Sequence, residues 1–421
     1  RHADFQRHPV ESISTANVEQ VVVIPALAEH ANLPATLDSL ALNPPDERNR
    51  TLVIITVNNR APRHSRDDYL ADNQATLAWL RAIAPTAQLR LGIIDAASPG
   101  RELGDKEGVG AARKIGMDWA LRILMQNDCP DGPIVCLDAD THVAPDYLAA
   151  VRNAFRTRPW AAVIAYAHSL DGNPARQKAI IAYELYLRYY TLGLLYAGSP
   201  YAFHTIGSTM ACAANAYLAV SGMNRRQAGE DFYFLMKLAK TGPVHTIYDT
   251  TVQPASRISD RVPFGTGAAI TRFTDGSEDP YTTYDARVFF ALKQWLTCAT
   301  DDLATPAANS LKQAGRDIPG LATFFEKAQF DETLAKLKAH SSGAQALERQ
   351  FHRWFDGFRT LKLLHHLRDA AYPNADLLVG LRTLLGSMPR SDRALAAAND
   401  ATHEDLDSQL ELLTQLRELE R

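Results

Sequence analysis

Short apolar runs rich in β-branched residues alternate with segments of helical spacing over residues 1–150, and this alternation restricts the possible folds most strongly. The run EQVVVIPAL contains Pro25, and the run TLVIITVNN ends in Asn58 and Asn59. Continuous apolar runs of this length are typical of strands that are buried on both faces. Strands that alternate with helices predict βαβ units and a doubly wound, mainly parallel sheet. The predicted strands are residues 19–27, 51–59, 89–95 and 133–138, and the predicted helices between them are residues 32–42, 67–84 and 109–126.

The character of the sequence changes after about residue 275. From residue 281 onward the apolar residues follow helical spacing, and this part contains no predicted strand. We therefore predict an α/β domain over residues 18–275 and an all-helical C-terminal region over residues 276–421. Within the later part of the α/β domain, the predicted strands are residues 161–167 and 244–255, and the predicted helices are residues 174–197 and 229–242.

Composition excludes several classes of protein. The formal net charge of −4 provides no global basic field for nucleic acid. No stretch of about 18 apolar residues is free of charge, so we predict no transmembrane segment. The nearest candidate, residues 179–198, contains Glu184 and Arg188 and predicts an amphipathic helix. The 4 cysteines show no C-x-x-C spacing, which favours reduced thiols and a cytoplasmic location.

Two carboxylates follow the predicted strand at residues 133–138. Asp138 and Asp140 flank one alanine in the sequence LDADT. Ligands of doubly wound sheets bind beyond the carboxyl ends of the strands. Carboxylate oxygens suit hard divalent cations such as Mg²⁺ or Mn²⁺. The pair could hold a metal ion and, through it, a diphosphate, or it could form a polar turn that ends the strand or caps the following helix. The pair alone leaves these interpretations open, and its position after a buried strand adds weight to the metal site.

Two further segments could contribute chemistry. In EGVGAARKIG, Gly110 lets a backbone approach closely, and Arg113 lies near a helix start that favours phosphate. The alternative is a helix that packs tightly on the sheet through small residues. In GEDFYF, Glu230 and Asp231 begin a helix, and either could act as a general base. The alternative is that both acids only complement the helix dipole.

The order and spacing of these segments resemble a nucleotide-sugar glycosyltransferase of the GT-A fold, family 2. The resemblance rests on VVVIPALAE, GVGAARKIG, LDADT, TIGSTMACAANAYLAVSGM and GED, and it extends over about residues 21–254. It implies a Rossmann-like, doubly wound mixed sheet with a nucleotide-sugar half at about residues 18–150 and an acceptor half at about residues 151–275. It implies a divalent metal cofactor, Mn²⁺ or Mg²⁺, a nucleoside-diphosphate sugar donor and an acceptor with a hydroxyl group.

The resemblance also assigns roles to single residues. Asp140 corresponds to a direct metal ligand, and Asp138 to the metal shell or the donor ribose. Asp231 corresponds to the catalytic base of inverting members, with Glu230 in support. Gly207 and Ser208 correspond to the acceptor side, whereas the donor-binding residues are Pro25, Ala26, Glu29, Asn58, Asp95, Gly110, Arg113 and Asp138.

The sequence departs from the family pattern at the position that usually reads the base. Family members have acidic residues after the second strand, but this chain has Asn58-Asn59, and an amide both donates and accepts hydrogen bonds. Asp95 could take over part of that task, and the identity of the nucleotide stays open. Arg257 and Arg261 could form a cationic loop over the diphosphate, or the segment could be a solvated connection to the helical region.

Several alternatives to an inverting transferase stay open at this point. The same fold could support a retaining transferase or a nucleotidyltransferase. The chain could also be a non-catalytic sugar-nucleotide-binding protein, a sensor or an assembly scaffold, in which the helical region carries out the function. That region could mediate formation of a homo-oligomer, capture of the acceptor or peripheral contact with the inner face of a membrane.

Overall fold

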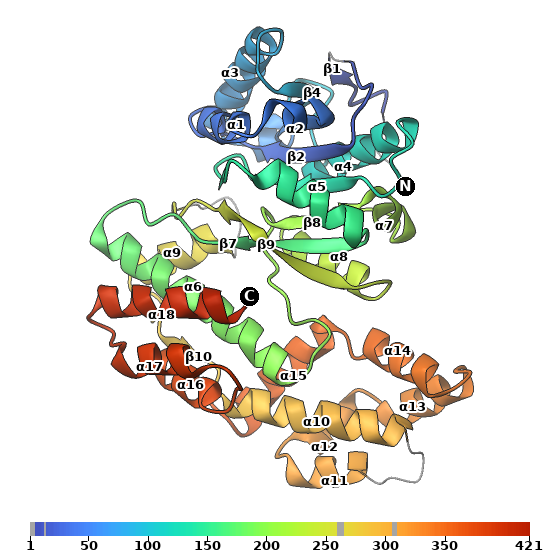
Figure 1. Ribbon diagram of the computed structural model, residues 1–421, viewed down its shortest axis with the longest axis vertical. Helices are drawn as coiled ribbons and strands as arrows, with labels where there is room; N and C mark the ends of the chain where they lie inside the picture. Colours follow the sequence, from blue (N-terminus) through green and yellow to red (C-terminus); the bar gives the residue numbers. More distant parts are fainter. Residues whose placement is uncertain (1–4, 12–13, 259–264, 305–309) are drawn as a thin grey trace. The chain divides into compact units, whose positions relative to one another are not determined.

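A computed structural model describes residues 5–11, 14–258, 265–304 and 310–421 (Figure 1). The contacts within the chain group it into two compact units. Unit one contains residues 1–171 and 205–268, and unit two contains residues 172–204 and 269–421. The contacts therefore place the helix at residues 174–196 with the C-terminal helices. The predicted division at residue 275 stays a prediction.

Unit one is built around one mixed sheet with the strand order β1-β4-β3-β2-β5-β8-β7-β9-β6. The pairs β2–β3, β3–β4, β2–β5 and β7–β9 are parallel, whereas the other neighbouring pairs are antiparallel. The predicted doubly wound mixed sheet is thus confirmed. The strands are β1 (Val10–Glu11), β2 (Gln20–Ala26), β3 (Thr51–Asn58), β4 (Arg90–Ala96), β5 (Pro133–Cys136), β6 (His142–Val143), β7 (Ala161–Tyr166), β8 (Met210–Ala213) and β9 (Val244–Gln253).

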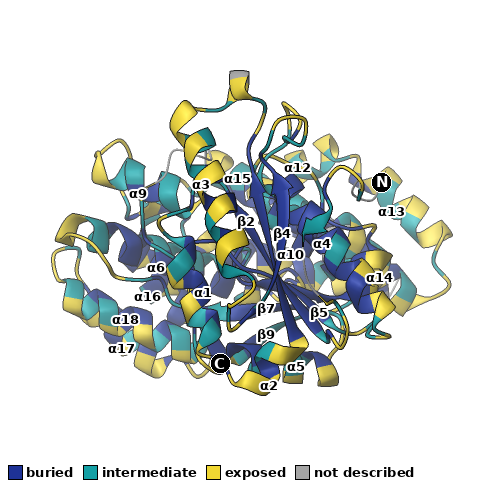
Figure 2. Cartoon of the chain, turned by 90° about the horizontal axis from the view of Figure 1, so that it is seen from above, coloured by how far each residue is buried: buried dark blue, intermediate teal, exposed yellow. Residues whose placement is uncertain are grey.

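The strand order creates a switch point between β2 and β5. From β2, the chain proceeds outward through β3 to β4 and then returns to the other side of β2 as β5. Crevices at such switch points, beyond the carboxyl ends of the strands, are the usual ligand sites of open α/β sheets. The central strands are buried because helices cover the sheet (Figure 2). The helices of this unit are α1 (Leu33–Ala41), α2 (Pro45–Arg50), η1 (Pro62–His64), α3 (Asp67–Ile83), α4 (Val109–Gln126), α5 (Tyr147–Thr157), α7 (Ala214–Ala219) and α8 (Glu230–Ala239).

Helix α4 packs on the centre of the sheet through small residues. It lies against β2, β3 and β5. A Cβ atom added at Gly116 would meet the side chains of Val23 and Thr56, so glycine allows this close approach. The sequence pattern of small residues therefore has a packing role along this helix, as one of the two interpretations predicted.

Unit two is a helical body around a second core. Trp295 is fully buried, and the rings of Phe325, Phe330, Phe351 and Phe355 pack around it. Such aromatic pairs bury a large apolar area and prefer edge-to-face or tilted contacts. The helices are α6 (Pro174–Tyr196), α9 (Thr266–Thr274), which begins at the boundary of the units, α10 (Arg287–Ala304), α11 (Ser310–Asp317), α12 (Leu321–Lys327), α13 (Phe330–Ala339), α14 (Ala344–Trp354), α15 (Gly357–Ala370), α16 (Leu377–Leu385), α17 (Asp392–Asp400) and α18 (Leu406–Leu419).

The helical prediction for the C-terminal region is confirmed, with one correction. Two short strands, β10 (Thr282–Thr283) and β11 (Ala375–Asp376), form an antiparallel pair in the region that was expected to contain no strand. Two-residue strands are too short to produce a recognisable alternation of polar and apolar residues. Among the helices that the structure describes, none is long and apolar enough to cross a membrane.

Candidate active site

The carboxylate pair lies at the switch point of the sheet. Strand β5 ends at Cys136, so Asp138 and Asp140 project from the loop beyond its carboxyl end. The backbone N–H of Leu137 donates to the carbonyl oxygen of Val23, which holds this loop beside β2. The side chain of Asp138 is 37% exposed and that of Asp140 is 20% exposed. Both carboxylates are thus fixed by the sheet and can still be reached by a ligand.

Arg113 connects the carboxylate pair with the acidic start of α8. Its guanidinium, which is almost fully buried, donates to Asp138 and to Glu230. Burial lowers the pKa of Arg113, but the carboxylates of Asp138 and Glu230 raise it, and the net direction is upward. Arg113 is therefore a permanent cation that holds two acids from distant parts of the sequence at one place.

Two glycines allow the segments around Arg113 to approach closely. A Cβ atom at Gly110 would lie 2.6 Å from the carbonyl oxygen of Arg226 and 2.9 Å from the Cβ atom of Glu230. A Cβ atom at Gly207 would overlap the guanidinium of Arg113. Strand β8 runs antiparallel to β5, so Gly207, which precedes β8, lies at the same edge as Asp138. The structure thus brings Gly110 and Gly207 to the site, and both make room for protein atoms.

The environment of Asp231 raises the pKa of its carboxyl towards neutral pH. Its Oδ1 accepts a hydrogen bond of 2.7 Å from the backbone N–H of Phe232. Burial and the neighbouring Glu230 raise the pKa of Asp231 to about 7, although Arg113 acts in the opposite direction. Burial also raises the pKa of Glu230 against the effect of Arg113. A carboxyl with a pKa near the working pH can both accept and release a proton.

Glu29 and Arg257 form a second cluster with Asp140. Arg257 follows β9, and its guanidinium pairs with Asp140 and with Glu29. Glu29 is 5% exposed and also accepts a hydrogen bond of 2.7 Å from the side-chain amide of Asn32. Of the two arginines considered for a cationic loop, Arg257 therefore reaches the carboxylate pair, and Arg261 lies outside the described residues.

The structure places the predicted nucleoside-binding residues along the ends of β2, β3 and β4. Pro25 and Ala26 end β2 and are buried. The side-chain amide of Asn58 donates to the carbonyl oxygens of Ala26, at 3.0 Å, and Thr56, at 3.2 Å. Asn58 therefore ties two strand ends together, and its part in reading a base stays a prediction.

Asp95 is separated from the carboxylate pair by two strands. It lies near the end of β4, where its Oδ1 accepts from the backbone N–H groups of Ala97 and Ser98, at 3.1 and 2.8 Å. Burial raises the pKa of Asp95, but the hydrogen bonds from Ser98 and Ala97 outweigh this effect, so the net direction is downward. Asp95 therefore stabilises the loop after β4 through these backbone hydrogen bonds.

A buried network beside the site was not predicted. Lys114 lies 3.0 Å from both carboxylate oxygens of Asp118, and the hydroxyl of Tyr217 donates to Asp118 over 2.7 Å. The spacing i, i+4 of Lys114 and Asp118 on a helix is a signal that sequence analysis could have used. This network joins α4 to α7, next to the loop that leads into α8.

The oxygen donors at the strand end fit a divalent cation. Mg²⁺ commonly takes one or two protein carboxylates, and waters and substrate phosphates complete its shell. Asp138 and Asp140 provide such a pair, and the buried hydroxyl of Thr141 has no hydrogen-bond partner in the described structure. The described residues contain no group of three or more His, Cys, Asp or Glu that could hold a metal alone. A cation at this place would therefore depend on the two aspartates and on ligand oxygens.

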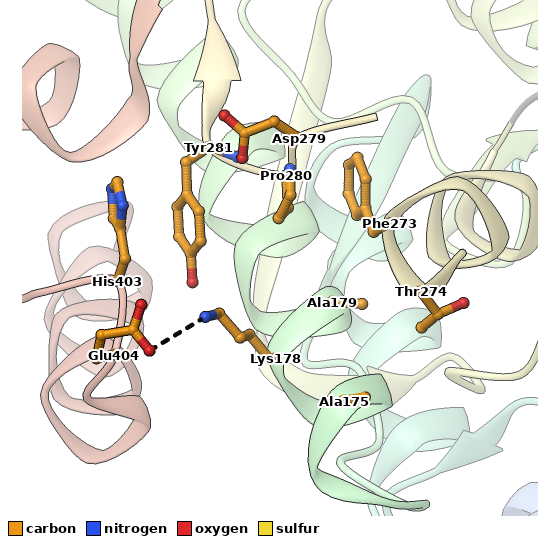
Figure 3. Close-up of a pocket in the computed structure, with 10 residues that line it drawn as sticks. All are labelled: Ala175, Lys178, Ala179, Phe273, Thr274, Asp279, Pro280, Tyr281, His403 and Glu404. Carbon is orange, nitrogen blue, oxygen red and sulfur yellow. Dashed lines mark hydrogen bonds and ion pairs between the residues drawn. The ribbon is translucent and has the colours of Figure 1, made fainter. Parts of the chain in front are cut away.

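A pocket of about 400 Å³ lies within unit two (Figure 3). The ring of Tyr281 stacks on His403, and the Nζ atom of Lys178 lies 3.8 Å from a carboxylate oxygen of Glu404. Acidic and basic groups are mixed, so the pocket has no clear preference for an ion of one sign. It contains none of the predicted site residues, and it is lined by Ala175, Lys178, Ala179, Phe273, Thr274, Asp279, Pro280, Tyr281, His403 and Glu404.

The central part of the chain is similar to a known protein family. Residues 133–295 match the model of the glycosyl transferase family group 2, a segment that contains both acidic pairs. No curated protein sequence matches the chain. Among solved structures, S. aureus TarS 1-349 in complex with UDP-GlcNAc has a TM-score of 0.37 and 13% identity, with 96% of this chain and 92% of that chain covered. S. aureus TarS 1-349 in complex with UDP has a TM-score of 0.35 and 13% identity, with 96% and 90% covered. The family match confirms the predicted resemblance over residues 133–295.

Proposed function

We propose that the chain transfers a sugar from a nucleoside-diphosphate donor to an acceptor hydroxyl in a metal-dependent reaction that inverts the anomeric centre. The observation that carries the proposal is the double ion pair of Arg113 with Asp138 and Glu230. One guanidinium therefore contacts both Asp138, which belongs to the predicted metal and diphosphate site, and Glu230, which is next to the predicted base. An inverting transfer needs both sides close together, because the leaving group and the attacking hydroxyl lie on opposite faces of one carbon.

Asp138 and Asp140 would hold the divalent cation, which would offset the negative charge that develops on the departing nucleoside diphosphate. The protein adds its own positive charge at this edge through Arg113 and Arg257. Glu29, in the segment after β2, would lie on the side of the donor. These groups would fix the diphosphate and orient the anomeric carbon of the sugar.

Asp231 would act as the general base. The acceptor oxygen forms a bond to the anomeric carbon while its proton passes to a carboxylate oxygen of Asp231. The bond from this carbon to the diphosphate oxygen breaks, and its electron pair leaves with the nucleoside diphosphate. The raised pKa of Asp231 supports this assignment, because a base is most effective when its pKa lies near the working pH. Glu230 would stay paired with Arg113 and support the start of the helix.

The test begins with a screen of sugar nucleotides by thermal shift and by donor hydrolysis, with and without Mn²⁺. A donor that binds the folded state raises the unfolding temperature by mass action. We expect one donor to be hydrolysed in a metal-dependent way, and D140N and D231N to lose this turnover. The exposed ion pair of Arg50 and Glu19 provides the control variant R50Q, which should keep full turnover.

The reaction products distinguish the inverting transfer from the other activities that the same fold could support. An inverted anomeric configuration in the proton NMR spectrum supports the proposal, whereas retention contradicts it. Release of pyrophosphate from a nucleoside triphosphate would indicate a nucleotidyltransferase. Binding of a sugar nucleotide without any turnover would indicate a non-catalytic binding protein.

A further inference from the structure

Arg257 lies against Asp140, the aspartate that is predicted to bind the metal ion. Its Nε–H group donates to Oδ2 of Asp140, and a terminal N–H group donates to Oε1 of Glu29. Asp140 comes from the loop beyond β5 and Glu29 from the segment after β2, so Arg257 spans the switch point of the sheet. One guanidinium therefore pairs with carboxylates from both sides of the switch point.

The two acids need this positive charge when no ligand is bound. Glu29 is 5% exposed and the side chain of Asp140 is 20% exposed, so water cannot fully solvate either carboxylate. Charges that are removed from water persist only where a partner of opposite sign compensates them. Both carboxylates together raise the pKa of Arg257 against the effect of burial, so the arginine stays charged.

A divalent cation and Arg257 compete for the same carboxylate. Oδ2 of Asp140 already accepts from the guanidinium, and two cations at one carboxylate repel each other. Arg257 itself is 29% exposed, unlike the buried Arg113, so it can move away without being drawn from a closed core. A diphosphate offers a guanidinium two acceptor oxygens in a geometry that suits its planar fork.

We propose that Arg257 is an internal counter-cation that keeps the metal position filled until a donor binds, and that it then exchanges Asp140 for the diphosphate. The proposal rests on the proposed function, because it uses the same metal and donor site. It makes metal binding and donor binding mutually dependent. The free enzyme holds Mn²⁺ weakly, since metal entry breaks the contact with Arg257 before any diphosphate compensates the arginine.

The test measures binding of Mn²⁺ alone to the full chain, by electron paramagnetic resonance of the free ion and by calorimetry. In R257Q the competing charge is absent, and we expect the Kd for Mn²⁺ to fall about tenfold or more, as for loss of a charge-assisted hydrogen bond. R257K keeps the charge on a single ammonium group, which is less suited to bridging two carboxylates, and should give an intermediate Kd. R50Q removes an exposed arginine of the same unit and should bind Mn²⁺ as the wild type does.

A double variant tests whether the tighter binding of Mn²⁺ in R257Q takes place at Asp140. D140N combined with R257Q should lose the tighter binding of Mn²⁺. Equal Kd values in wild type and R257Q, absence of measurable Mn²⁺ binding in both, or a gain that persists in the double variant would each overturn the proposal. Thermal unfolding of R257Q and R257K confirms that each variant is folded. Failure of the proposed function would appear separately, as absence of metal-stimulated donor hydrolysis in the wild type.

Discussion

Arg113 donates to Asp138 and Glu230 at the same time, and this contact joins the loop after β5 to the first turn of α8. The guanidinium and the side chain of Glu230 are both only 4% exposed. Breaking a buried ion pair on one side leaves a charge without compensation, which is far costlier than loss of a surface pair. Arg113 is thus a positioning residue for both acidic pairs.

We expect R113M to lower the free energy of unfolding by about 3–5 kcal/mol, because Glu230 then remains buried without its cation. The measurement is urea unfolding followed by circular dichroism. The double variant R113M/E230Q should recover part of this loss, since the buried charge of Glu230 is then also absent. R50Q, at an exposed pair, should change the value by less than about 1 kcal/mol. A loss in R113M as small as that in R50Q would contradict the assigned role.

The second prediction concerns the dependence of the rate on pH. Because burial and Glu230 raise the pKa of Asp231 to about 7, the base is protonated below this value. The rate of donor turnover should therefore rise with pH and reach half of its maximum near pH 7. D231N should remove this rise and lower the rate by about 10²–10⁴-fold, as expected for loss of a general base. The measurement is kcat from pH 5 to pH 9.

Two neighbouring variants should move this rise in opposite directions. Glu230 raises the pKa of Asp231, so E230Q should shift the rise to lower pH. Arg113 lowers the same pKa, so R113M should shift the rise to higher pH, provided that the variant is folded at the assay temperature. Shifts of the same sign would indicate that another group titrates.

The third prediction uses the close contact at Gly110. A methyl group there would lie 2.6 Å from the carbonyl oxygen of Arg226 and 2.9 Å from the Cβ atom of Glu230, so the segment leading into α8 must shift. Overpacking of this kind costs about 1–3 kcal/mol. We expect G110A to lower stability by this amount and to lower kcat more strongly than it raises the KM of the donor.

Gly315 provides the matched control for G110A. It lies within α11, and a Cβ atom there would meet nothing within 4 Å. G315A should leave kcat unchanged and stabilise the protein by about 0.5–1 kcal/mol, because alanine has a higher helix propensity than glycine. Unchanged stability and kcat in G110A would show that the segment before α8 can move without consequence.

The sequence predicts the central strands well because their apolar runs are continuous and are bounded by turn residues. It misses β8, because residues 210–213 lie in a long stretch of small and apolar residues without a clear period. Helical spacing continues over residues 346–369, but Asp356 divides this segment, since its carboxylate accepts from the backbone N–H of Arg359 and caps α15. Local caps of this kind override helical periodicity.

The candidate site was predicted as a set of residues but not as a set of contacts. The order of LDADT and GED along the chain indicates both acidic pairs. The contact of Arg113 with Glu230 depends on how α4 and α8 pack, and no sequence spacing encodes this distance. The same holds for Arg257, whose partners Glu29 and Asp140 lie far from it in the sequence and meet only because β2 and β5 are neighbours.

The last prediction concerns the ion pairs that connect α6 with α18 within unit two. Glu184 accepts from Arg188, at 2.7 and 3.1 Å, and from Arg417, at 2.9 Å, and Arg188 also pairs with Glu420. The side chains of Glu184 and Arg188 are 1% and 3% exposed. R188M should therefore lower the free energy of unfolding by about 3–5 kcal/mol and increase amide hydrogen exchange in α18.

The control R287Q alters a pair in which Arg287 is 56% exposed, and it should change the free energy of unfolding by less than about 1 kcal/mol. Exchange in α18 that is equal in R188M and R287Q would show that apolar packing of Leu412, Leu413 and Leu416 holds this helix without the ion pairs.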